Sequence, residues 1–178
     1  MDSTRKIQNV ALIGFMGTGK SSVGRLVADS LRFEYLDTDE LIEKRAGKSI
    51  SRLFEQDGEP AFRDLERQVI HELRNRKGVI ISTGGGAGAN EVNLGSLKEH
   101  ALVVCLWASP HIIWARVRTQ THRPLLQGAD PEGKIRDLLA VREPFYREAD
   151  VLLNTEVRSP KEVAQHVVHE FHLATRPR

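Results

Sequence analysis

One glycine-rich segment of the sequence has the residue types and spacing of a phosphate-binding loop. The segment Gly14-Phe15-Met16-Gly17-Thr18-Gly19-Lys20-Ser21 matches the pattern G-x-x-x-x-G-K-[ST]. Glycine backbones can aim N–H groups at phosphate oxygens, a lysine adds positive charge at the β- and γ-phosphates, and a serine hydroxyl can bind Mg²⁺. The candidate nucleotide-binding residues here are Gly17, Thr18, Gly19, Lys20, Ser21 and Ser22. The loop predicts nucleoside triphosphate binding, and by itself it does not separate a kinase from a GTPase or an ATPase.

Two carboxylates follow the short apolar run 33–36, in Asp37-Thr38-Asp39. Residues two apart in an extended chain point to the same side, so both carboxylates could face a ligand beyond the strand end. One could help to hold Mg²⁺ through water, and the other could accept a hydrogen bond from a hydroxyl that attacks phosphorus. The alternative is an aspartate that only caps a helix starting near Glu40, beside a solvated neighbour.

An arginine and a glutamate lie three residues apart on the predicted helix Phe62-Arg63-Asp64-Leu65-Glu66, where they can pair. The pair is either an ordinary surface contact or an arginine held for bidentate contact with a carboxylate.

The run Gly84-Gly85-Gly86 follows another predicted strand, so it is either a flexible loop or bare backbone that approaches a ligand.

Further arginines surround a polar segment at 119–130, namely Arg116, Arg118 and Arg123, and Arg142 lies on the next predicted helix. An arginine on a lid can neutralise charge that develops on a transferred phosphoryl group and can help to exclude water. The alternative is a basic face in contact with solvent.

These residues need a sheet and helices to position them, and short apolar runs alternate with helical patterns along the chain. The predicted strands are 10–13, 33–36, 79–81, 102–107 and 151–153. Helix starts are indicated by Ser109-Pro110, by Asp130-Pro131 and by the capping box Ser159-Pro160-Lys161-Glu162. Runs of successive apolar residues are typical of parallel strands buried on both faces. We therefore expect an α/β fold in three layers, with a five-stranded parallel sheet and helices on both faces.

The length of 178 residues suits a single domain, 1–178, and 40% hydrophobic residues allow a globular core. Two stretches interrupt the alternation, 37–76 and 119–130, and each is either a solvated connection or a functional insertion, the first for substrate binding and the second as a lid.

Charge and apolar content exclude several classes of protein. A formal net charge of +2 does not argue for nucleic-acid binding. The longest apolar run, 101–108, is too short to cross a bilayer, and the first residues contain no apolar stretch typical of a signal peptide. Cys105 is the only cysteine, so no internal disulfide can form, and we expect it to be a buried small hydrophobe in a cytoplasmic protein.

Taken together, the motifs resemble those of the shikimate kinase family. They occur in the order GFMGTGKS, DTD, FRDLE, GGG, HRPLL and REPFYRE, and they run from Val10 to about Pro160. The resemblance implies a P-loop kinase fold and transfer of the γ-phosphate of ATP to the 3-hydroxyl of shikimate, in aromatic amino-acid biosynthesis. It also implies a monomer.

On the nucleotide side, the resemblance implies that Lys20 cradles the phosphates and that Ser21 and Asp37 hold Mg²⁺. Arg123 would reach the phosphates from the lid. Arg116 would lie near the adenine, which the segment from Arg158 to Pro160 would border.

On the acceptor side, the resemblance implies that Asp39 binds the substrate hydroxyls and serves as the candidate base. Arg63 and Arg142 would bind the substrate carboxylate, and Glu66 would orient the site. The substrate would be lined by Gly84, Gly85 and Gly86.

Two other functions remain open from the sequence. A gluconate kinase would also act on a hydroxylated acid, although Arg63, the triple glycine and Arg123 favour shikimate. A regulatory module that binds nucleotide without transfer is disfavoured by the presence of Lys20 and Asp39.

Overall fold

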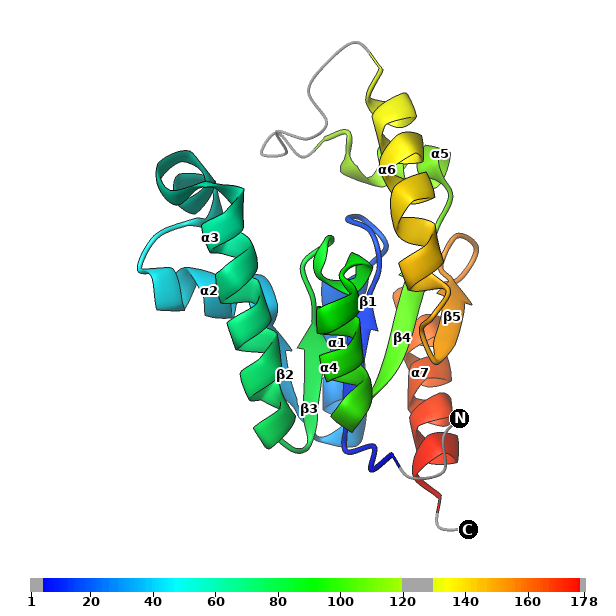
Figure 1. Ribbon diagram of the computed structural model, residues 1–178. Helices are drawn as coiled ribbons and strands as arrows, with labels where there is room; N and C mark the ends of the chain where they lie inside the picture. Colours follow the sequence, from blue (N-terminus) through cyan, green and yellow to red (C-terminus); the bar gives the residue numbers. More distant parts are fainter. Residues whose placement is uncertain (1–4, 120–129, 177–178) are drawn as a thin grey trace.

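The computed structural model describes residues 5–119 and 130–176, and these residues form a five-stranded sheet flanked by helices (Figure 1). Every pair of neighbouring strands is parallel, and the strand order is β2-β3-β1-β4-β5. The strands are β1 (Asn9–Ile13), β2 (Glu34–Asp37), β3 (Val79–Ser82), β4 (Ala101–Trp107) and β5 (Val151–Asn154). The helices are α1 (Lys20–Leu31), α2 (Thr38–Ala46), α3 (Ile50–Glu72), α4 (Glu91–His100), α5 (Pro110–Val117), α6 (Pro131–Tyr146) and α7 (Pro160–Thr175), with the short 3-10 turns η1 (Leu73–Asn75) and η2 (Ala87–Ala89).

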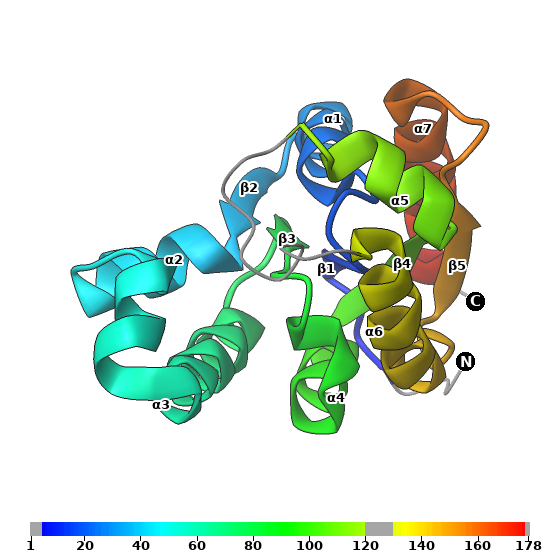
Figure 2. The same ribbon diagram turned by 90° about the horizontal axis from the view of Figure 1, so that it is seen from above.

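Alternation along the buried strands produces two separate cores. On β1, Val10 and Leu12 pack with α1 and α7, whereas Ala11 and Ile13 pack on the other face with α4, α5 and α6. Seen from above, α1 and α7 lie on one side of the sheet and α4 and α6 on the other (Figure 2). The predicted three-layer α/β fold with five parallel strands is therefore confirmed.

Strand and helix ends differ slightly from the predicted ones, for identifiable reasons. The first strand begins at Asn9, a polar residue that is fully buried because its amide bonds to Arg76 O at 2.9 Å and to Val79 N at 3.1 Å. The second strand is shifted by one residue and ends at Asp37, and the next helix starts at Thr38 instead of near Glu40. The capping box is confirmed, since Ser159 N donates to Glu162 Oε2 at 2.7 Å and Glu162 N donates to Ser159 Oγ.

The stretch 37–76 forms α2, α3 and η1, which stand beside the edge strand β2 (Figure 1). A small core of Ile42, Leu53, Phe62 and Val69 joins α2 to α3. Helix α3 bends at Gly58, whose φ of 81° breaks the helical backbone just before Pro60. The expected lid, 119–130, falls outside the described residues except for its two ends. None of the helices in the described ranges is long and apolar enough to span a membrane.

Candidate active site

Parallel strands bring their carboxyl ends to one edge of the sheet, and the predicted chemical residues follow three adjacent strands there. The phosphate loop follows β1, the glycine run follows β3 and Asp37 ends β2, in the spatial order β2-β3-β1. Open α/β sheets bind ligands outside these strand ends. Three cavities lie along this edge.

The middle cavity, of about 240 Å³, lies between the phosphate loop, the two carboxylates and the glycine run. Its lining includes Lys20, Ser21, Asp37, Asp39 and Gly84. A second cavity, of about 280 Å³, lies on the other side of the phosphate loop, and both cavities are lined by Gly17, Gly19 and Ser22. The phosphate loop therefore lies between two cavities, and a phosphoryl group held by the loop could pass from a ligand in one cavity to a ligand in the other.

The phosphate loop is compact and internally bonded. The Lys20 ammonium donates to Gly14 O at 2.8 Å and to Phe15 O at 2.9 Å, and the Thr18 hydroxyl also donates to Phe15 O at 2.8 Å. Gly17 has a φ of 74°, and a Cβ there would lie 2.6 Å from a methyl carbon of Val117, so only glycine fits. Helix α1 begins at Lys20 and directs its positive end at this loop.

Arg116 closes one wall of the second cavity. Its guanidinium donates to Gly17 O at 3.3 Å, to Thr155 Oγ1 at 3.0 Å and to Thr155 O at 2.6 Å. Arg158 and Pro160 line the same cavity. The structure therefore brings together the residues predicted to border the nucleotide base, at the junction of the phosphate loop and the end of β5.

Asp37 and Asp39 line one cavity, although the reason given from the sequence was wrong. They are not two residues of one extended strand, because Asp37 ends β2 and Asp39 lies in the first turn of α2. Asp37 does cap this helix, with Oδ1 accepting from Asp39 N at 3.0 Å, and its Oδ2 accepts from the Tyr35 hydroxyl at 3.2 Å. The capping alternative is thus correct for Asp37, and it leaves that carboxylate on the cavity wall.

The Asp39 carboxyl has a strongly raised pKa. Burial raises its pKa to about 6, the Asp37 and Glu66 carboxylates add to the rise, and Lys20 opposes it. Its Oδ1 atom is buried and has no hydrogen-bond partner among the described residues. Water would donate a hydrogen bond to an exposed acceptor atom, but this atom is buried. A hydroxyl of a bound ligand could supply the hydrogen bond that Oδ1 lacks.

The pH dependence of turnover follows from this carboxyl. A general base must be ionised, so we expect turnover to fall as the pH drops through about 6, the pKa of Asp39 in the folded protein. The measurement is turnover from pH 5 to pH 8 at saturating substrates, with circular dichroism to confirm that the protein stays folded. A flat profile down to about pH 4.5 would contradict the assignment, because an ordinary aspartate titrates near pH 4.

Because Gly84 has no side chain, the Asp39 carboxylate can occupy the space beside it. A Cβ at Gly84 would lie 2.5 Å from Asp39 Oδ1, and the Gly84 N–H donates to the buried Thr38 hydroxyl at 3.0 Å. We expect Gly84→Ala to displace the carboxylate and to lower turnover by about 10² or more, as misplacement of about 1 Å can do. ATP affinity, measured by calorimetry, should change little. Gly95→Ala is the matched control, because a Cβ there meets nothing within 4 Å.

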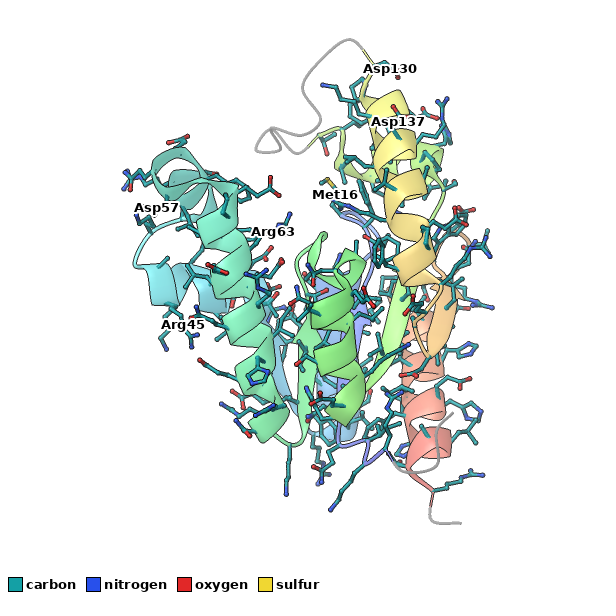
Figure 3. The ribbon with its side chains drawn as sticks, in the orientation of Figure 1. Met16, Arg45, Asp57, Arg63, Asp130 and Asp137 are labelled. Atoms are coloured by element: carbon teal, nitrogen blue, oxygen red, sulfur yellow. The ribbon has the colours of Figure 1, made fainter. Side chains whose placement is uncertain are left out.

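Arg63 and Glu66 form a half-buried ion pair on α3. The Arg63 Nη1 atom lies 3.0 Å from Glu66 Oε2, and Glu66 is only 1% exposed. Burial raises the pKa of Glu66, whereas Arg63 lowers it. Figure 3 shows Arg63 on the side of α3 that faces the phosphate loop, where Met16 lies. The geometry therefore excludes an ordinary surface contact.

A third cavity, of about 210 Å³, brings Arg63 and Arg142 together beside Gly86. Arg142 Nη1 donates to Gly85 O at 2.9 Å, and its guanidinium lies 5.1 Å from the centre of the Phe15 ring. The buried Tyr146 hydroxyl donates to the same carbonyl at 2.9 Å. Two guanidinium groups that converge on one cavity are suited to bind a carboxylate.

Some residues at this edge were not predicted from the sequence, among them Tyr35, Thr38, Asn93 and Tyr146. Thr38, Asn93 and Tyr146 act through contacts between distant segments, which no local pattern could reveal, whereas Tyr35 bonds to Asp37, two residues away. Arg123 lies outside the described residues, and its role therefore stays a prediction.

A larger cavity, of about 480 Å³, lies between α2, α3 and the edge strand β2. Its lining combines leucine and valine side chains with the charged residues Lys44, Arg45, Glu72 and Arg76. It contains none of the predicted site residues, so its volume alone does not make it the candidate active site.

The donor set of the middle cavity fits Mg²⁺. Ser21 offers a hydroxyl and Asp37 a carboxylate, and such hard oxygen ligands suit this ion. In the described part of the chain, no three His, Cys, Asp or Glu side chains are placed to hold a metal. A magnesium ion carried by nucleotide phosphates needs only one or two protein ligands.

Comparisons with known proteins agree with this geometry. The model of the family described as shikimate kinase matches residues 16–172. The chain belongs to the shikimate kinase family. A shikimate kinase from Thermodesulfovibrio yellowstonii is 44% identical over 165 residues, which cover 93% of this chain and 95% of that protein. The resemblance seen in the sequence motifs is thus confirmed.

Solved structures place the fold in the same family. The shikimate kinase of Acinetobacter baumannii, solved in complex with shikimate, superposes with a TM-score of 0.88 at 38% identity and covers 97% of this chain and 96% of that one. A gluconokinase from Sinorhizobium meliloti superposes with a TM-score of 0.64 at 15% identity, covering 96% of this chain and 95% of that one. The second likeness shows the shared fold alone.

Proposed function

We propose that this member of the shikimate kinase family transfers the γ-phosphate of Mg-ATP to the 3-hydroxyl of shikimate, giving shikimate 3-phosphate and ADP. One observation carries the proposal: the buried Oδ1 of Asp39 has no hydrogen-bond partner among the described residues, and Asp39 lines a cavity with the phosphate loop that adjoins, along the glycine run, the cavity lined by Arg63 and Arg142. A phosphoryl acceptor that has both a hydroxyl and a carboxylate matches this arrangement, with its hydroxyl at Asp39 and its carboxylate at the two arginines.

Asp39 is proposed as the residue that positions the attacking hydroxyl and accepts its proton. Its pKa of about 6 keeps it ionised at neutral pH and makes it more basic than an ordinary aspartate. The Gly84, Gly85 and Gly86 backbone would line the ring of the substrate. Arg63 and Arg142 would bind the carboxylate, and Glu66 would orient Arg63.

Lys20 and the phosphate-loop amides would hold the β- and γ-phosphates, and Lys20 would stabilise the charge that grows on the transferred group. Mg²⁺, when bound with the nucleotide, would neutralise phosphate charge, with Ser21 as a direct ligand and Asp37 as a ligand directly or through water. Arg116 and Arg158 would border the adenine. Arg123 on a lid over 119–130 stays a prediction, as do the substrate-binding role of 37–76, the cytoplasmic location and the monomeric state.

A coupled assay of ADP release tests the proposal, with Mg-ATP and either shikimate, gluconate or no acceptor. Release that depends on shikimate, with shikimate 3-phosphate identified by mass spectrometry, is expected. Faster release with gluconate would favour a gluconate kinase. Equal release in all three would indicate only an ATPase, and nucleotide binding without any release would favour a regulatory module.

A further inference from the structure

Asn93 makes a buried contact that connects two walls of the candidate acceptor site. Its side-chain amide donates to Glu66 Oε2 at 3.3 Å, and Asn93 is only 1% exposed. Asn93 lies in the first turn of α4, and Glu66 lies on α3. The contact therefore ties the helix of the arginine to the helix that follows the glycine run.

Asn93 is itself held in place by its backbone. Its N–H donates to the side chain of Asn90, which caps α4, at 3.1 Å. One turn earlier, the Ala89 N–H donates to Gly86 O at 3.1 Å, and a Cβ at Gly86 would lie 3.0 Å from the Arg63 guanidinium. The Asn93 amide thus approaches Glu66 from a rigid element that also carries the glycine wall of the site.

We propose that Asn93 is a positioning residue for the acceptor carboxylate, because its amide orients the Glu66 carboxylate that in turn orients Arg63. The inference rests on the proposed function. Arg63 Nη1 donates to both Glu66 oxygens, at 3.0 and 3.3 Å, and Asn93 bonds to Oε2, the nearer of the two. The last torsion of a glutamate is soft, so a fixed donor decides the plane of the carboxylate. Without that donor, Glu66 can turn and Arg63 Nη1 loses its fixed partner, while Glu59 Oε1 still accepts from Arg63 Nε at 3.2 Å and from Nη2 at 3.1 Å.

Because Glu66 is ionisable, the effect of losing its hydrogen bond from Asn93 should depend on pH. Burial raises the pKa of Glu66, while Arg63, the Asn93 amide and Arg142 lower it. The Asp39 carboxylate of α2 faces the same space and repels it. Removing the amide removes one contact that favours the charged form, so Glu66 becomes neutral at a higher pH and then attracts Arg63 less.

Two variants of Asn93 separate this role from packing. Asn93→Leu keeps the branching and the number of side-chain heavy atoms and removes the donor, so we expect the KM for shikimate to rise about tenfold, as for a lost bond to a charged group. The rise relative to the protein without the substitution should grow as the pH is lowered, while the KM for ATP stays within about twofold. Asn93→Asp keeps the shape but places a second carboxylate beside Glu66. Its defect should be largest where both carboxyls are ionised and should shrink as the pH is lowered, because a proton shared by the two carboxyls replaces the lost donor.

A packing role would produce a different result, with Asn93→Asp nearer to normal than Asn93→Leu and no opposite pH trends. That result, or an unchanged shikimate KM in both variants, would overturn the proposal. Leu97→Ala is the control, because Leu97 lies further along α4 in the main core and its loss tests destabilisation alone. Shikimate binding by calorimetry without ATP makes the comparison independent of turnover. If the protein without substitutions binds shikimate but transfers no phosphate, the proposed function is contradicted. The role of Asn93 would still be tested in that case, because the shikimate affinities of its variants can be compared without turnover.

Discussion

Replacing Asp39 by asparagine is expected to lower turnover with shikimate by about 10² to 10⁴, the usual contribution of a general base. The amide has nearly the same shape, but it cannot take the proton of the attacking hydroxyl. Nucleotide binding should persist, because the phosphate-loop contacts of Lys20 do not involve Asp39. The measurements are turnover in the coupled assay and ATP affinity by calorimetry.

The same substitution is expected to stabilise the protein. Folding moves the Asp39 pKa from its ordinary 3.8 to about 6, so above pH 6 the folded state holds a carboxylate that it disfavours. Because the unfolded chain binds fewer protons between these values, stability falls as the pH rises through this window. The cost at neutral pH is on the order of 2–3 kcal/mol, and Asp39→Asn should recover part of it as a higher Tm.

The control for Asp39→Asn is Asp64→Asn, on the exposed face of α3, which should change neither turnover nor Tm appreciably. Near-normal turnover of Asp39→Asn would remove Asp39 from the role of base. A lower Tm would mean that the ionised carboxylate is stabilised by the fold, contrary to its raised pKa.

Replacing Arg63 by alanine is expected to raise the KM for shikimate by about 10² or more, because the proposed bidentate contact with the substrate carboxylate would lose two charge-assisted hydrogen bonds. The KM for ATP should change little, since Arg63 lies across the glycine run from the nucleotide cavity. Initial rates at varied shikimate and fixed Mg-ATP measure the effect. Arg63→Lys should also be impaired, because an ammonium keeps the charge but not the planar fork.

Arg67→Ala supplies the matched control for Arg63. Arg67 lies one turn further along α3, is exposed and pairs only with Asp64 in the described part of the chain. Its loss should leave the shikimate KM unchanged and alter stability by no more than about 0.5 kcal/mol. Arg63→Ala should be less stable than Arg67→Ala, because it leaves the buried Glu66 without its main partner. Normal shikimate affinity in Arg63→Ala would place the carboxylate elsewhere.

The phosphate loop shows how much could be predicted from local sequence. Its function depends on backbone conformation and on residue spacing within Gly14–Ser21, so the motif carries nearly all the information. The strands β1, β3 and β4 were also predictable, because each is apolar and buried over successive residues, whereas the edge strands β2 and β5 are only partly buried and were predicted from shorter apolar runs. Their ends were less so: Asn9 is in β1 because of bonds to residues that lie about seventy positions away, such as Val79.

The amino-acid sequence by itself determined the class of fold, the nucleotide site and the family, since all three depend on motifs that are short and ordered along the chain. Only the tertiary structure decided how Asp37 and Asp39 share one cavity, since one ends a strand and the other begins a helix. It also decided that Glu66 is buried and that Asn93, on another helix, bonds to it. The pKa of Asp39 belongs to the same category, because burial and neighbouring charges from three elements set it, and no local pattern encodes distances between elements.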